Sequence, residues 1–386
     1  MKKIAIIGGG ISGLYIANLL RQNPNYETIV YEKNNSANLE KGYGIQLSVN
    51  SIKLLNKIGF QNVSSEEKFY PSKVDFYSLK NKKKICDLDI SAFNSTEEKY
   101  TTLQRFILIS FLKDKLPNNL IRYNKEVKEV QNVSGSTKVI FEDNSIIECD
   151  YLIISDGIFS KTRSLITKKE IKAKYIKSIA LRAIIDRNDL HEIDHNNISL
   201  FLGSNLHSVI YPVNENGQFN FISVLKKNLN KQELADQSLF DSKDFISSAL
   251  LEISKQVDNT IIKNLKNIKC FPIFVSTEIA QPKNKNTFLI GDAFFAYPPT
   301  FAQGASQSIE VAHKLYENFE NENNQFHKER IERTKMIDRR SRLNYFAFHL
   351  SNSLMSKIRN SIMRYLVKNK KFINSYLGKI YKQEFV

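Results

Sequence analysis

Apolar runs broken by glycine-rich turns divide the first part of the chain into short strands and helices. The β-branched run Lys3–Ile7 predicts a strand, Ile11–Leu20 a helix and Thr28–Tyr31 a second strand. These three elements form one βαβ unit. The same patterns predict strands at 74–79, 84–88, 138–141, 146–149 and 151–154, and helices at 50–57 and 103–116.

The pattern changes near residue 174, where short strands separated by turns replace the alternation of strand and helix. Strands are predicted at 179–185, 199–202, 208–213 and 219–225. They indicate a second, mostly antiparallel sheet. Residues 232–266 then read as helical, 287–290 as a buried strand, and the chain is helical from about Gly304 almost to its end.

Composition changes this picture little. The 386 residues are 42% hydrophobic and 25% charged, as in ordinary soluble globular proteins. The three cysteines, Cys86, Cys149 and Cys270, fit neither a metal site nor a disulfide framework, which favours a reducing compartment. Neither a signal peptide nor a run near the roughly 20 apolar residues that span a bilayer is found. We expect a cytoplasmic protein.

The net charge of +16 is concentrated at the C-terminal end. Residues 339–386 hold eleven lysines and arginines against one acid, Glu384. Such a segment is a solvated face, or it lies on an anionic surface such as the inner face of a membrane. Because no nucleic-acid motif accompanies it, we expect no nucleic-acid partner.

The first chemical motif follows the first strand. Gly8, Gly10 and Gly13, with Ile11 and Ser12 between them, have the spacing of a dinucleotide fingerprint, whose helix N-terminus faces a pyrophosphate. Glu32 and Lys33 end the second strand, where a carboxylate can accept hydrogen bonds from ribose hydroxyls. This motif alone does not separate FAD from NAD.

Two later motifs also follow predicted strands. Asp156-Gly157 is trailed by Ser160 and Arg163, and Gly291-Asp292 leads through Pro298-Pro299 to a helix start. That helix start is Gln303, Gly304, Ala305 and Ser306. Asp292 can accept hydrogen bonds from ribityl or ribose hydroxyls, and the N–H groups of the helix suit a flavin edge that gains negative charge. Arg163 can offset pyrophosphate charge or hold the surrounding loops.

With these motifs in this order, the chain resembles the class A flavoprotein aromatic hydroxylases, such as p-hydroxybenzoate and salicylate hydroxylases. The family's helical arginine is matched by Arg105. The chain departs from the family where Phe294-Phe295 replaces a usual histidine, where Val311 replaces a usual aspartate, and in having no tryptophan.

The resemblance implies a fold and a division into domains. We expect an α/β protein with a Rossmann-like FAD-binding domain of the glutathione-reductase type, an inserted mostly antiparallel substrate domain and a helical C-terminal region. The boundaries are 1–69, 100–173 and 281–335 for the FAD-binding domain, 70–99 and 174–280 for the substrate domain, and 336–386 for the basic region.

The resemblance also implies a reaction. NADH or NADPH, bound transiently, would reduce FAD, and O2 would form a flavin C4a-hydroperoxide that hydroxylates a small phenolic ring. No metal is expected. Candidate substrate-pocket residues are Arg182, His207, Tyr211, Tyr297 and Pro299. Two alternatives stay open: a membrane-surface hydroxylase of a quinone-pathway ring, and a flavin-binding reductase without oxygenase activity. Monomer and dimer are equally compatible.

Overall fold

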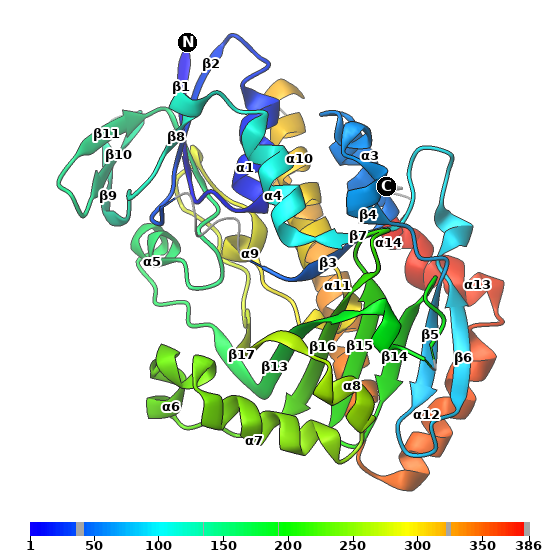
Figure 1. Cartoon of the computed structure of the whole chain (residues 1–386). Helices are drawn as coiled ribbons and strands as arrows, with labels where there is room; N and C mark the ends of the chain where they lie inside the picture. The colour runs from blue at the N-terminus through cyan, green and yellow to red at the C-terminus, as the bar shows by residue number, and fades with distance from the viewer. Residues whose placement is uncertain (36–41, 134, 192, 322–325, 382–386) are drawn as a thin grey trace.

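A parallel sheet and a large mostly antiparallel sheet form the two main parts of the molecule, and helices from the C-terminal end lie beside the second (Figure 1). The computed structural model describes residues 1–35, 42–133, 135–191, 193–321 and 326–381. Strands β1 and β2 belong to the first sheet, β13 to β17 belong to the second, and helices α6 and α7 run across one side of the latter.

The parallel sheet carries the candidate motifs. Its strand order is β18-β12-β1-β2-β8, and each neighbouring pair is parallel. The carboxyl ends of these strands therefore meet along one edge, where ligands bind in open α/β sheets. The strands are β1 (Lys2–Ile7), β2 (Tyr26–Tyr31), β8 (Ile121–Arg122), β12 (Tyr151–Ile154) and β18 (Thr287–Leu289).

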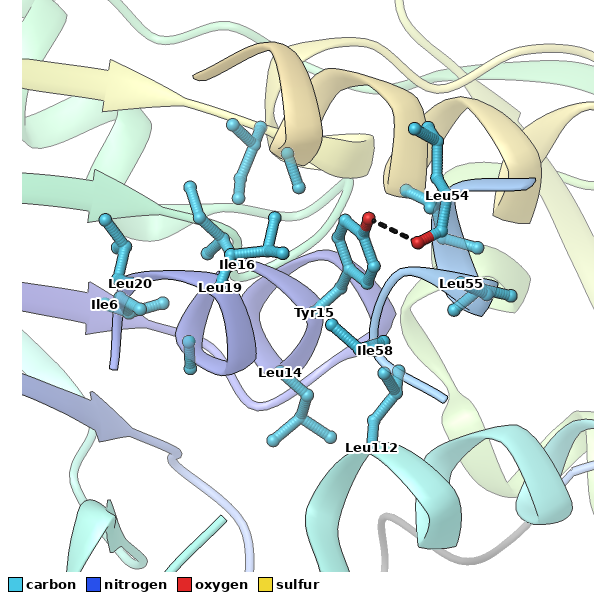
Figure 2. Packing of buried hydrophobic residues seen from close by; sticks show 14 of the residues in the cluster. Ile6, Leu14, Tyr15, Ile16, Leu19, Leu20, Leu54, Leu55, Ile58 and Leu112 are labelled. Carbon is cyan, nitrogen blue, oxygen red and sulfur yellow. Dashed lines mark hydrogen bonds between the residues drawn. The ribbon is translucent and has the colours of Figure 1, made fainter. Parts of the chain in front are cut away.

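Helix α1 (Ile11–Leu20) anchors the core beside this sheet. Every residue from Ser12 to Leu20 is buried, because α3 (Val49–Asn56), α4 (Arg105–Asp114) and α10 (Gly304–Asn321) pack around it. Figure 2 shows Tyr15 at the centre, where its hydroxyl donates to the Leu54 carbonyl at 3.0 Å. Each fully buried apolar side chain of this kind contributes about 1.5–3 kcal/mol.

The second sheet has the order β17-β13-β16-β15-β14-β5-β6. All neighbours are antiparallel except β14 and β5, which pair in parallel. It therefore draws strands from two stretches far apart in the sequence. The strands are β5 (Lys73–Ser78), β6 (Lys84–Asp89), β13 (Lys174–Asp186), β14 (Ile198–Leu202), β15 (Leu206–Pro212), β16 (Gln218–Lys226) and β17 (Lys266–Val275).

Two small three-stranded sheets complete the strands. One has the order β3-β7-β4 and the other β11-β10-β9. The first packs against the large antiparallel sheet, since Thr102 of β7 donates to the Pro212 carbonyl of β15 at 2.5 Å. Their strands are β3 (Gly44–Leu47), β4 (Lys68–Phe69), β7 (Thr101–Gln104), β9 (Val127–Val133), β10 (Ser136–Phe141) and β11 (Ile146–Cys149).

The C-terminal region is helical: α11 (Phe326–Phe348), α12 (Ser353–Leu366), α13 (Lys370–Ile373) and α14 (Lys379–Tyr381) follow one another. Arg340 of α11 donates to the carbonyls of Ser375 and Tyr376, so the last helices fold back against α11. Across the described residues, none of the helices has the length and apolar character needed to cross a bilayer.

The predicted fold class is confirmed: an α/β nucleotide-binding part, an inserted mostly antiparallel sheet and a helical C-terminal region. Two element predictions were wrong in detail. The helix predicted from Leu103 begins at Arg105, because Leu103 pairs with Ile45 in a sheet. The long helix predicted at 232–266 is broken, and its last residue opens β17. The domain boundaries stay a prediction.

Side-chain caps explain the broken helix. Asn230, Asp236, Ser242 and Asp258 each accept a hydrogen bond from a backbone N–H just downstream and so start a new turn. The result is α6 (Lys231–Ala235), a 3-10 turn, α7 (Lys243–Ser254) and α8 (Asn259–Lys263).

A buried ion-pair cluster fastens α10 to α11. The Glu310 carboxylate accepts hydrogen bonds from Arg330 at 2.5 Å and from Arg333 at 2.8 Å. Asn50 and Gln307 also donate to it. Burial alone would raise the pKa of Glu310, but Arg333 and Arg330 together lower it to about 2. Removal of one partner from such a cluster strongly destabilises the folded protein, because an uncompensated buried charge is left behind.

We therefore expect Glu310→Gln to lower the free energy of unfolding by about 3 kcal/mol. The pH dependence has a defined sign: because the folded pKa is depressed, the stabilisation is full above the ordinary value of 4.5 and is lost as pH falls toward about 2. Urea unfolding between pH 7 and pH 2 measures both effects. Glu129→Gln on exposed β9 is the matched control; equal unfolding curves for the two variants would contradict the assignment.

Candidate active site

The glycine turn and Glu32 contact each other directly. The Gly9 N–H donates to one Glu32 carboxylate oxygen at 2.7 Å, and the backbone N–H and side-chain amide of Asn34 donate to the other at 2.9 Å. Glu32 is buried, whereas Lys33 is exposed. Three donors thus fix the orientation of the Glu32 carboxylate at the end of β2.

The three motifs meet at the edge of the parallel sheet. Gly8 has a φ of 106°, and a Cβ there would lie 2.6 Å from the Ser155 carbonyl oxygen. The Ser155 hydroxyl donates to the Gly8 carbonyl at 2.9 Å. A Cβ at Gly291 would overlap the Ser12 side chain. Residues that are distant in the sequence are therefore packed so closely that only glycine fits between them.

Gly10 has a different reason to be glycine. Its φ of −79° suits any residue, and a Cβ there would meet no protein atom within 4 Å. Packing within the protein therefore does not require glycine at this position, whereas the close approach of a pyrophosphate does. No side chain caps α1, so the N–H groups of its first turn suit an anion. The residues present fit the diphosphate of FAD.

Arg163 bonds to the protein itself, whereas Asp156 keeps one carboxylate oxygen, Oδ1, without a hydrogen-bond partner among the described residues. Asp156 accepts from the Thr162 N–H at the start of α5 (Lys161–Thr167), and burial raises its pKa. Arg163 is buried and donates to the carbonyls of Ala293, Ile158 and Ile171 at 2.9–3.2 Å. Of the two roles foreseen for Arg163, its contacts are those that hold the loops. Gly157 faces open space.

Asp292 and Arg105 form the charged part of the site. Asp292 follows β18 and is exposed to solvent, yet the protein around its carboxylate desolvates it and raises its pKa to about 6. The attraction of Arg105 opposes this shift. Burial and the nearby Arg182 lower the pKa of Arg105, and the attraction of Asp292 opposes that lowering. The exposed Asp292 carboxylate is accessible to the hydroxyl groups of a ligand.

Ser48 fixes the start of α10 by hydrogen bonds. The Ser48 N–H donates to the Ser306 hydroxyl at 3.0 Å, and the Gln303 amide donates to the Ser48 hydroxyl at 3.3 Å. A Cβ at Gly304 would meet no protein atom within 4 Å, and Ala305 is only partly buried. The first turn of α10 is therefore rigid and accessible, which suits donation to a flavin edge.

An apolar cavity of about 430 Å³ adjoins this segment. Pro299, Thr300 and Phe301 form one wall, the strands of the large sheet a second, and helices α11 to α13 the third. Of the candidate substrate residues, Pro299 and His207 line the cavity, whereas Arg182, Tyr211 and Tyr297 do not. The cavity size is typical of a site for a small organic molecule.

The three candidates outside the cavity have other partners. Arg182 donates to the Gly44 carbonyl at 2.5 Å and lies over the Tyr43 ring. Tyr211 is buried beside Arg182, and burial raises its pKa to about 12. Tyr297 donates to the Thr334 hydroxyl at 3.2 Å, away from the cavity.

A pair of buried histidines gives the cavity a hydrogen-bond acceptor. His349 Nδ1 lies 2.8 Å from the Tyr345 carbonyl, and His349 Nε2 lies 3.3 Å from the Val224 carbonyl. We assign the proton to Nδ1, which has the shorter contact, so that Nε2 is an acceptor. His207 Nδ1, 3.2 Å away, then donates to His349 Nε2. Burial lowers the pKa of both rings, so both are neutral. His207 Nε2 therefore carries a free lone pair, and none of the described residues donates a hydrogen bond to it.

Sequence reasoning missed Ser48, Gln46 and the helical wall of the cavity. Ser48 contacts the α10 start, and Gln46 lines the cavity and accepts from Tyr100 at 2.8 Å. Gln46 belongs to β3, whose partner strand β7 is distant in the sequence, so no local pattern indicated that this segment lies beside the start of α10.

The FAD binding domain family matches residues 1–333, so the chain belongs to this family. The 6-hydroxynicotinate 3-monooxygenase of Pseudomonas fluorescens is 24% identical over 80% of this chain and 80% of its own length. The 3-amino-4-hydroxybenzoate 2-monooxygenase of Streptomyces platensis is 23% identical over 94% and 92%, respectively.

Solved structures share the fold. HpxO of Klebsiella pneumoniae, in complex with FAD and uric acid, superposes with a TM-score of 0.85 at 18% identity and covers 100% of this chain and 98% of its own. A salicylate hydroxylase substrate complex gives 0.81 at 16% identity, with 99% and 96% covered. The resemblance to class A FAD-dependent aromatic hydroxylases is confirmed; the chain is an oxidoreductase of the monooxygenase type, and its cofactor is FAD.

The two glycine environments make a matched test. Gly10→Ala should leave the unfolding free energy of the FAD-free protein within about 1 kcal/mol of wild type, since no protein atom is near, but should weaken FAD retention. Gly13→Ala should destabilise the FAD-free protein itself, because the new Cβ would overlap the Gly8 carbonyl. Urea unfolding and released-flavin absorbance measure the two effects. Full FAD retention by Gly10→Ala would contradict the assignment.

Proposed function

We propose that this protein is an NAD(P)H-driven, FAD-dependent monooxygenase that hydroxylates a phenolic ring in the 430 Å³ cavity. One observation carries the proposal: the turn Pro299–Phe301 forms a wall of the cavity and leads directly into the first turn of α10. A ring in the cavity would therefore lie beside the segment that suits the flavin.

Different residues would bind the cofactor and orient the substrate. Glu32, the first turn of α1 and Asp292 would hold the ribose, diphosphate and ribityl parts of FAD, respectively. Bound FAD supplies the activation of O2 with electrons from NADH or NADPH. The chain itself would orient the ring and exclude water through the apolar walls of the cavity. No described side chain needs to react covalently.

The cavity favours a neutral substrate. Arg359 is the one charged side chain among the described lining residues, and its guanidinium already donates to the Ala347 carbonyl and to Asn360. A carboxylate in the cavity would therefore find no uncommitted cation among these described lining residues to offset its desolvation. A phenol hydroxyl, by contrast, can donate to His207 Nε2. This distinguishes the proposed substrate from the aromatic acids named for several relatives.

The role of Asp292 is tested by Asp292→Ala, which should lower FAD affinity at least tenfold through the loss of its hydrogen bonds. Asp114→Ala, at the exposed end of α4, is the control and should stay yellow. Flavin is released by denaturation and identified as FAD or FMN. If Asp292→Ala binds FAD as tightly as wild type, the assigned cofactor site is wrong.

The reaction is tested with a panel of neutral phenols and aromatic acids. We expect a neutral phenol to accelerate NAD(P)H oxidation and to give one hydroxylated product per O2 consumed. Oxygen electrode traces and product mass spectra measure this ratio. Oxidation that yields only peroxide with every phenol would favour the alternative function, a flavin reductase, and would overturn the monooxygenase proposal.

A further inference from the structure

Helix α12 exposes an apolar stripe to solvent. Leu354, Met355, Ile358, Ile362 and Tyr365 are 66%, 44%, 44%, 52% and 70% exposed. At about 100° per residue these positions fall within an arc of about 100° on one face of the helix. Leu343 and Phe346 of α11 are also exposed, at 58% and 62%. Apolar patches of this kind on soluble proteins mark interaction sites.

Cations flank the stripe. Residues 339–381 contain no aspartate or glutamate, so no acid of this segment offsets its lysines and arginines. Lys357, Arg364 and Lys368 of α12 and its C-terminal end are exposed, and Lys370 and Lys371 follow. A helix with an exposed apolar face and cations beside it has the character of an interfacial helix that lies along an anionic bilayer.

The same face forms the opening of the cavity. Met355, Ile358 and Ile362 line the cavity and are also 44–52% exposed, so the helical wall of the cavity is in contact with solvent. A ligand reaching the cavity along α12 would cross a surface made of apolar side chains. Exposure of these apolar side chains to water is unfavourable, whereas against a bilayer they would contact the acyl chains.

We propose that α12 docks on an anionic lipid surface and that the cavity takes a lipophilic phenol from that surface. The second part rests on the proposed function, whereas docking does not. A second copy of the chain is a poorer occupant, because two identical faces would bring like charges together. Nucleic acid would leave the apolar stripe in water. Charge complementarity and continuity with the cavity both favour lipid.

The absence of tryptophan allows a clean optical test of docking. Tyr365→Trp places a sole indole on the stripe, and Ile146→Trp places one on exposed β11 as the matched control. Vesicles of phosphatidylcholine, with and without phosphatidylglycerol, are the probes. We expect the indole emission of the Tyr365→Trp variant to shift to the blue with phosphatidylglycerol vesicles at low salt and to return at high salt, with no shift for the control. An unchanged emission of the Tyr365→Trp variant would overturn docking.

Sedimentation with the same vesicles measures the affinity. Leu354→Ser with Tyr365→Ser removes apolar area without altering the cavity lining and should weaken binding about tenfold. Lys357→Gln should weaken it about fivefold. Val133→Ser and Lys172→Gln are the exposed controls and should bind as wild type. FAD content and circular dichroism verify folding of each variant. Equal vesicle binding by all variants would overturn the proposal. A wild-type protein that does not bind vesicles but forms a dimer, which the stripe variants abolish, would overturn it as well.

A final measurement separates the two proposals. With vesicles present, kcat/KM for 4-alkylphenols should rise with chain length in wild type and rise less in the Leu354→Ser, Tyr365→Ser variant. A protein that binds vesicles but hydroxylates nothing would leave docking intact and overturn the proposed function. A hydroxylase indifferent to chain length and to vesicles would overturn only the supply of substrate from lipid.

Discussion

The buried Glu310 carboxylate is the interaction on which the arrangement of the active site depends. It lies in α10, whose first turn belongs to the candidate cofactor site, and it binds Arg330 and Arg333 of α11, which is part of the helical wall of the cavity. Arg333 also donates to the Lys379 and Ile380 carbonyls, so the last helix is fixed as well. Removing charges from water is costly, and two guanidinium partners with matched geometry offset that cost here. The start of α10 and the helical wall of the cavity are thereby held in a fixed position relative to each other.

The candidate cofactor site follows from sheet topology. Four parallel strands end at one edge, so Glu32, the glycine turn and the segments after β12 and β18 meet although the sequence separates them widely. Close packing at Gly8, Gly13 and Gly291 holds the turns together, while Gly10 and Gly304 keep space on the outer side. Two different physical demands, contact within the protein and access for a ligand, are thus met by the same residue type.

The sequence predicted what is local and missed what depends on remote partners. The βαβ unit and the motifs after strands were predictable because periodicity and turn chemistry lie within a few residues. Strands β3, β7 and β17 were missed, since their hydrogen-bond partners are far away in the chain. For the same reason Arg182 and Tyr297, plausible pocket residues by type, lie outside the cavity: Gly44 and Thr334 bind them. The role of His207 follows from His349, 142 residues later.

The C-terminal helices unite a surface and a cavity that are usually separate features. An exposed apolar stripe costs solubility, and a chain with ten net positive charges in this region offsets that cost by repulsion between copies. The same cations would attract an anionic surface, so one distribution of charge would both oppose association between copies and favour the proposed lipid partner. Because Met355, Ile358 and Ile362 belong to both features, contact with lipid would shield the opening of the cavity from water. Exclusion of water would also serve the proposed chemistry beside the flavin, so the proposed docking and the proposed chemistry would depend on the same apolar wall.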